Sequence, residues 1–142
     1  MARPRPGTRI NVASTRNVAL VAPALLLLLS FAVVAGRAQI AEGAVAEAAR
    51  AAAREASLAR SGDAAAAAAR AEQALIDQDL HCQSTTVDID TAGFQAPPGQ
   101  PADVTVTVSC VVGMADLLAP GLPGSVTVEA SFTSPLDAFR ER

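Results

Sequence analysis

One uncharged stretch near the N-terminus constrains this chain more than any other feature. Between Arg16 and Arg37 no side chain is charged, and residues 18–36 read VALVAPALLLLLSFAVVAG. As a helix this stretch is about 28 Å long, close to the thickness of the hydrocarbon core of a bilayer. Its larger apolar side chains contribute about −3 to −7 kcal/mol toward membrane insertion. The sequence therefore predicts a single transmembrane helix over residues 18–36.

Charge is distributed unevenly on the two sides of this stretch. Four arginines precede it without an acid among them, whereas all fourteen aspartates and glutamates follow it. Because arginine-rich flanks stay on the cytoplasmic side, we expect a cytoplasmic N-terminus and an exported remainder. From residue 38 onward six arginines face fourteen acids, a net charge of −8. This excess repels phosphate backbones, so we expect the lipid bilayer as a partner and no nucleic acid.

A cleavable signal peptide is the alternative interpretation of the same stretch. The basic start, the apolar run and the small residues Gly36 and Ala38 satisfy a loose signal peptidase site. The run is longer than the usual apolar region of about 7–15 residues, which favours a retained anchor. If cleavage occurs, the chain is a secreted small binding domain.

The next segment is rich in residues of high helix propensity. Residues 38–60 contain many alanines and no proline, so we expect the membrane helix to continue through them. Glu47 and Arg50 are spaced to pair across one helical turn. The polar residues 61–63 interrupt the helix, and a second helix runs to about Leu80. One weakly apolar stripe of this second helix is expected to lie on a sheet: Ala64, Ala68, Ala71, Leu75 and Ile76.

Three later stretches alternate between apolar and polar side chains, as half-buried strands do. Residues 85–91 place Val87 and Ile89 on one side, and residues 103–112 place five apolar side chains on one face. Residues 125–132 alternate again after a loop of prolines and glycines. We therefore expect an α+β fold, in which a small three-stranded antiparallel sheet packs on a helix.

These elements divide the chain into four parts. The expected order is a cytoplasmic arginine-rich arm (1–17), the transmembrane helix (18–36), extracytoplasmic Ala-rich helices with a break at 61–63 (37–80), and a small β domain (81–142).

Two cysteines lie at the ends of the first two predicted strands. Cys82 precedes the first strand and Cys110 ends the second, and in an antiparallel pair these two ends lie side by side. Outside the membrane we expect a disulfide, which stabilises the domain by about 3–4 kcal/mol. Two buried free thiols are the alternative. Because two cysteines and one adjacent histidine are an incomplete zinc ligand set, we expect no metal and no other cofactor.

No constellation of catalytic residues is visible in the sequence. His81 is the single histidine, and it has no nucleophile elbow, HExxH motif or phosphate-binding loop beside it. Asp88 and Asp90 share one strand face, and Asp77 and Asp79 lie near the preceding helix end, where exposure to solvent explains them. We expect a protein that is not an enzyme and has no small-molecule substrate. A membrane-anchored hydrolase using the strand aspartates is the competing hypothesis.

The order of these parts resembles the TadE-like family, the small membrane-anchored minor pilins or pseudopilins of bacterial Tad-type pilus assembly. NVALVAPALLLLL is similar to the family's membrane segment, and AAAREASLARSGDAAAAAARA to its helix. CQSTTVDIDTAGF and VTVTVSCVV are similar to its cysteine-paired sheet. The resemblance runs from about Arg16 to the C-terminus. It implies a structural subunit of a type IV-related pilus or secretion system, whose partners are other pilin or pilus-assembly subunits.

Two landmarks of the family are absent from this chain. The family has a glycine before its processing site and a glutamate five residues after the cut, and Val12 and Asn17 stand at these positions. The resemblance therefore implies a divergent minor pilin that stays whole in the membrane. The candidate loop for contacting partners contains Phe94, Pro97 and Pro98.

Overall fold

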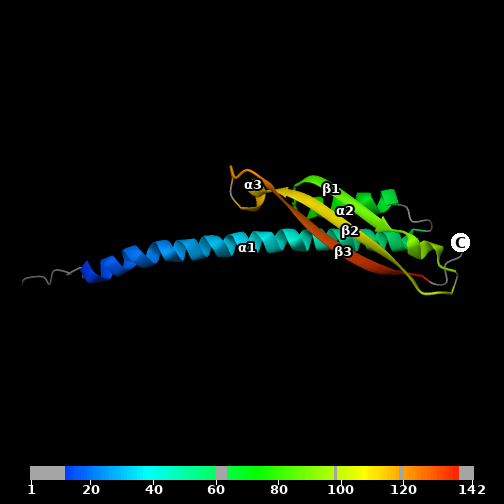
Figure 1. Ribbon diagram of the computed structural model, residues 1–142, viewed down its shortest axis with the longest axis horizontal. Coiled ribbons are helices and arrows are strands. Elements are labelled where there is room, and N and C mark those ends of the chain that lie inside the picture. Colours follow the sequence, from blue (N-terminus) through cyan, green and yellow to red (C-terminus); the bar gives the residue numbers. More distant parts are fainter. Residues whose placement is uncertain (1–11, 60–63, 98, 119, 138–142) are drawn as a thin grey trace, which may run out of the picture. The chain divides into compact units, whose positions relative to one another are not determined.

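The computed structural model describes residues 12–59, 64–97, 99–118 and 120–137, with backbone alone for 12–17. The fold is α+β, as predicted. The chain forms two compact units, Met1–Ala35 and Gly36–Arg142, and each unit is described by itself. The elements, shown in Figure 1, are α1 (Val12–Leu58), α2 (Ala64–Asp77), β1 (Cys82–Asp90), the 3-10 helix η1 (Ala92–Gln95), β2 (Ala102–Gly113), the short α3 (Met114–Leu117) and β3 (Ser125–Leu136).

Helix α1 is continuous from Val12 to Leu58, so the predicted continuation of the apolar helix into the Ala-rich segment is confirmed. Its first residues fall within the arm expected over 1–17. Pro23 lies inside the helix, where it removes one backbone donor. Ser30, the polar residue of the apolar stretch, donates its hydroxyl to the carbonyl oxygen of Leu26 at 2.8 Å. That bond satisfies the hydroxyl within the helix, as an apolar environment requires.

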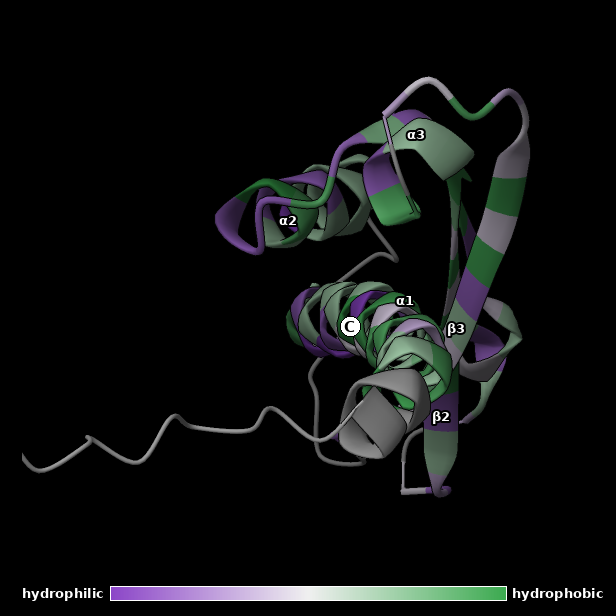
Figure 2. Ribbon diagram, turned by 90° about the vertical axis from the view of Figure 1, so that its left-hand side faces the viewer, coloured by the Kyte–Doolittle hydropathy of each residue, from purple (hydrophilic) through white to green (hydrophobic). Residues whose placement is uncertain are grey.

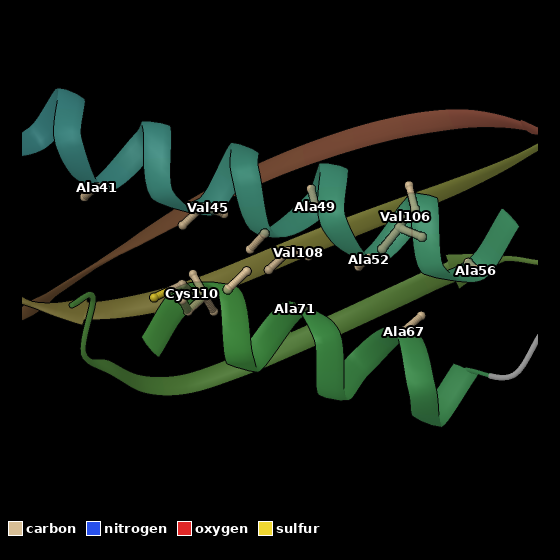
Figure 3. Close-up of a cluster of buried hydrophobic side chains, with 14 of the residues drawn as sticks. Ala41, Val45, Ala49, Ala52, Ala56, Ala67, Ala71, Val106, Val108 and Cys110 are labelled. Carbon is tan, nitrogen blue, oxygen red and sulfur yellow. The ribbon is translucent and has the colours of Figure 1, made fainter. Parts of the chain in front are cut away.

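The second half of α1 and helix α2 pack on the same face of the sheet (Figure 2). Their buried side chains recur at helical spacing and are almost all alanine, so the backbones of the two layers approach closely (Figure 3). The buried residues of α1 are Ala41, Ala44, Val45, Ala48, Ala49, Ala52, Ala53 and Ala56. Those of α2 are Ala67, Ala71, Ala74 and Leu75.

The apolar stripe expected on α2 is only partly correct. Ala71 and Leu75 are buried, but Ala64 is exposed and Ile76 is 67% exposed. The arc that faces the core passes through Ala67 instead. In a run of six consecutive alanines every helix face has the same hydropathy, so the sequence carried no signal that distinguishes one arc from another.

Helix α2 ends at Asp77 rather than near Leu80, and its end has a clear physical cause. The amide of Leu80 donates to the carbonyl of Leu75 at 3.1 Å, and the amide of Asp79 donates to that of Ile76 at 2.9 Å. Asp79 has φ of 56°, the left-handed conformation that this pair of bonds requires. Aspartate tolerates that conformation better than most residues. The turn directs the chain into β1 at Cys82.

The sheet has the order β1-β2-β3, and both neighbouring pairs are antiparallel. The central strand β2 carries the core on one face, where each side chain is at most 1% exposed: Val104, Val106, Val108, Cys110 and Val112. This is the face predicted from the alternating pattern. β1 begins at Cys82, before its predicted start, and ends at Asp90, one residue before its predicted end. β2 is one residue longer at each end than predicted, and β3 continues through Pro135 to Leu136.

Candidate functional site

The apolar part of α1 exposes its large side chains along its whole length. Leu20 and Leu27 are each 71% exposed and Phe31 is 73% exposed. Soluble monomers rarely expose a contiguous apolar surface of this kind. Among the described residues this is the one helix that is long and apolar enough to cross a membrane. Lipid or another apolar helix is the environment that these side chains require.

The second half of α1 also has a face that is turned away from the core. Ile40 is 70% exposed and Leu58 is 72% exposed. Gly43 lies on this face with open space around the position that a Cβ would take. The face therefore combines two apolar side chains with a point where another helix backbone can approach closely.

Glu47 and Arg50 form the ion pair that their spacing predicted, at 2.5 Å between carboxylate oxygen and guanidinium nitrogen. Arg50 also lies over the ring of Phe132 on β3, with 5.2 Å between the guanidinium carbon and the ring centroid. Sequence reasoning missed this second contact, because nothing in the local pattern links residues so far apart. The contact shields part of the ring and joins α1 to the edge strand of the sheet.

The expected disulfide joins Cys82 and Cys110, whose Cα atoms are 5.4 Å apart. Register explains the proximity, since Thr85 lies opposite Cys110 and Cys82 lies opposite Val112. One extra residue is accommodated between Cys82 and Ser84, where the register shifts. The bond closes the end of the sheet at which α2 delivers the chain, so both cysteines are structural.

The solitary histidine, His81, is exposed beside the disulfide. It lines a shallow hollow of about 280 Å³ together with Leu75, Ile76 and Leu80. No group of three or more histidine, cysteine or acidic residues is placed to hold a metal ion within the described ranges. The sulfur of Cys82 is bonded to Cys110, so His81 has no thiolate partner.

The aspartates singled out in the sequence are exposed, and three of them have structural contacts. A carboxylate oxygen of Asp90 accepts the amide of Ala92 at 2.9 Å, which begins η1. A carboxylate oxygen of Asp77 accepts the side-chain amide of Gln73 at 2.9 Å on α2. Asp79 forms the turn that ends α2. Three of the four aspartates thus lie at the ends of helices or strands. The fourth, Asp88, is an exposed residue in the middle of β1.

The candidate partner loop is attached to the domain by its aromatic residue. Phe94 is half-buried and packs against the core cluster. Gly93 lies against the backbone of Asp103, where an added Cβ would stand 2.0 Å from the carbonyl oxygen. Only glycine fits at that approach. Pro97 is exposed, and Pro98 lies outside the described residues.

The family landmark positions, Val12 and Asn17, have their backbone in α1, and their side chains lie outside the described part of the chain. Among the described residues, the structure brings the two cysteines together in the disulfide and Glu47 together with Arg50, as the sequence predicted.

The outer face of the sheet is a polar ladder that the sequence analysis did not single out. Ser and Thr hydroxyls of β2 and β3 pair directly across the strands, at 2.9 Å for Thr105 with Thr133 and 3.2 Å for Thr107 with Ser131. Ser109 donates to the carboxylate of Glu129 at 3.0 Å. The sequence feature that could have predicted this ladder is the set of two threonines and one serine that alternate with the core residues of β2. This face holds β3 in register with β2.

Comparison with known proteins adds no relative to this description. No family model, no curated protein and no solved structure matches the chain.

Proposed function

We propose that this chain is a membrane-anchored, non-enzymatic subunit of a Tad-type pilus or a related secretion system, a TadE-like minor pilin. The observation that carries the proposal is α1. One continuous helix combines an exposed apolar segment with an Ala-rich segment that forms part of the core of a disulfide-closed domain. The proposal also draws on the resemblance in the order and spacing of the chain's parts.

In this proposal the work of the protein is mechanical. The apolar segment keeps the subunit in the bilayer, where insertion is favourable by several kcal/mol. The face of α1 with Ile40, Gly43 and Leu58 packs beside helices of other pilin subunits. The arginines before the apolar segment keep the N-terminus in the cytoplasm, and the disulfide then forms in the oxidising compartment outside.

Two measurements on cells that express the full chain test the anchor and its orientation. We expect the protein to stay in the membrane pellet after alkaline carbonate extraction. We also expect added protease to digest the C-terminal domain in spheroplasts without lysis. A soluble cytosolic protein, with both thiols open to alkylation, would contradict the proposal.

The assembly role needs its own test in the source cells. Deletion of the gene should abolish or strongly reduce the pili recovered by mechanical shearing, and expression of the full chain in trans should restore them. Pili that are unchanged in amount and length after deletion would refute the assembly role while leaving the membrane anchor intact.

One observation favours the second candidate, a secreted small binding domain. The compact outer unit begins at Gly36, which is itself one of the two small residues that satisfy a signal peptidase site. Cleavage after Ala38 would leave the buried residues of α1 from Ala41 onward in place. Mass spectrometry of the mature N-terminus separates the two candidates: a start at Gln39 means secretion, and a start upstream of Val18 means an anchor.

A further inference from the structure

The sheet is open at the edge formed by β3. Within the part of the chain that the structure describes, the strand order β1-β2-β3 leaves one side of β3 without a neighbouring strand. β3 pairs with β2 over twelve consecutive positions without a register shift, so its backbone is regular. A strand edge of this length presents a row of backbone groups that another chain can pair with. Pro135 limits the usable edge to the residues that precede it.

An apolar groove runs beside this edge. It has a volume of about 410 Å³ and lies between the second half of α1 and the first half of β3. Its apolar lining comes from Ala38, Ala41 and Ala46 of α1, Leu117 of α3, and Val126, Val128 and Ala130 of β3, and Glu42 also lines it on the α1 side. Val126 is 41% exposed although it stands on the face of the sheet that carries the core. The groove is therefore the place where the inward side chains of a fourth strand would lie.

The opposite edge of the sheet is less suited to accept a strand. β1 is shorter, and its register is broken between Cys82 and Ser84. It also carries two exposed aspartates, Asp88 and Asp90, along the same strand. Bulges and charges of this kind are the usual means by which proteins block pairing at a sheet edge. β3 has a single charged residue, Glu129, and no bulge.

The charges around the β3 edge indicate what kind of strand fits. Glu129 is the only charge on β3, and Glu42 is the charged residue on the α1 side of the groove. Arg50 of α1 contacts β3, but its guanidinium is already paired with Glu47 and stacked on Phe132. Two copies of this chain paired through β3 would bring two Glu129 carboxylates to one interface, which disfavours self-association. A partner strand with a basic residue complements the edge.

We propose that the β3 edge and its groove bind an extended segment of a partner protein, with apolar side chains at alternate positions and an arginine or lysine opposite Glu129. The apolar side chains enter the groove between α1 and β3, and the backbone continues the sheet as a fourth strand. This inference rests on the outer unit alone. It holds whether or not the chain serves a pilus, and either proposal can fail without the other.

The test uses the full chain in nanodiscs of zwitterionic phosphatidylcholine and a fluorescent nine-residue peptide. The peptide has valine at its four even positions, arginine at the centre and threonine elsewhere, and its twin has glutamate at the centre. We expect the arginine peptide to bind about three- to tenfold more tightly than its twin, measured by anisotropy against empty nanodiscs. Absence of saturable binding up to millimolar concentration overturns the proposal.

A charge reversal tests whether the preference for the arginine peptide arises at Glu129. Glu129→Arg should reverse the preference, so that the glutamate peptide binds more tightly than the arginine peptide. Asp88→Arg changes the net charge by the same amount on the other edge strand, and it should leave the preference unchanged. If both variants shift the preference equally, net charge alone is responsible and the proposed site is wrong.

A second pair of variants tests the groove. Ala46→Phe fills it and should weaken binding of both peptides about tenfold, whereas Ala69→Phe adds the same ring at an exposed position of α2 and should not. Hydrogen exchange should show new protection on β3 in the peptide complex. An intact disulfide and an unchanged melting temperature confirm that the variants are folded. Protection on β1, equal effects of the two phenylalanines, or dimers that form through β3 without peptide would each overturn the proposal.

Discussion

The two halves of α1 use apolar residues in opposite ways. In the segment from Val18 to Val33 the large side chains of leucine, valine and phenylalanine are 52–73% exposed. In the segment from Ala41 to Ala56 the buried side chains are small, and all but one are alanine, at 0–4% exposed. One helix thus presents its largest apolar side chains outward and buries its smallest.

The size and exposure of the apolar side chains therefore suit each half of α1 to a different environment. A leucine gains about 1.5–3 kcal/mol from leaving water, so exposed leucines require lipid or another apolar helix. An alanine gains little by burial, but it lets the helix lie close to the sheet. The α+β domain within Gly36–Arg142 therefore obtains its stability from close contact and a disulfide rather than from bulky side chains.

The largest expected effect comes from placing charge in the exposed half. Leu26→Arg together with Leu29→Arg adds about 5–7 kcal/mol against insertion, which cancels the favourable term of the whole segment. We expect the double variant to leave the carbonate-resistant pellet. Leu26→Ala with Leu29→Ala should remain there, because alanine carries no comparable penalty. If the arginine variant stays in the membrane, the exposed leucines have another role.

Removal of the disulfide tests whether the domain that contains the buried half of α1 depends on this covalent link for its stability. Cys82→Ala with Cys110→Ala should lower the free energy of unfolding of the domain by about 3–4 kcal/mol, because the unfolded chain regains the freedom of the opened loop. Chemical denaturation followed by circular dichroism measures the change. A loss below about 1 kcal/mol would mean that the alanine layer is sufficient by itself.

Enlarging a buried alanine tests how tightly the layers pack. Ala49 of α1 is fully buried in the core that α1, α2 and the sheet share, so Ala49→Leu should destabilise the domain by about 1–3 kcal/mol through overpacking. Leu27→Ala, the reverse exchange in the exposed half, should leave the unfolding midpoint of the domain unchanged. Equal effects from the two variants would remove the distinction between the halves.

The smallest effect concerns the contact between α1 and β3. Arg50→Gln removes the pair with Glu47 and the stacking over Phe132, and it should destabilise the domain by about 0.5–1 kcal/mol because the side chain is half exposed. Arg54→Gln, at an exposed position of the same helix, is the matched control. The same loss in both variants would assign the effect to helix charge rather than to the ring.

Much of the fold could be read from periodicity and spacing. The apolar helix, its continuation, the three strands and the disulfide were all predictable, because each depends on a pattern within about thirty residues of sequence. The buried arc of α2 was not, since Ala67 and Ala68 are identical in chemistry. The Arg50 contact with Phe132 and the groove at β3 were also invisible, because they join segments that the sequence separates by about eighty residues.

By itself the sequence determined that one segment is too apolar for water, that β2 has one core face, and that the cysteines lie at adjoining strand ends. Only the tertiary structure decided which alanines face the core, and that an apolar groove accompanies the β3 edge of the sheet. The reason is physical. Local patterns reflect the period of a helix or strand, whereas burial and open edges depend on how distant segments are stacked, which no local pattern encodes.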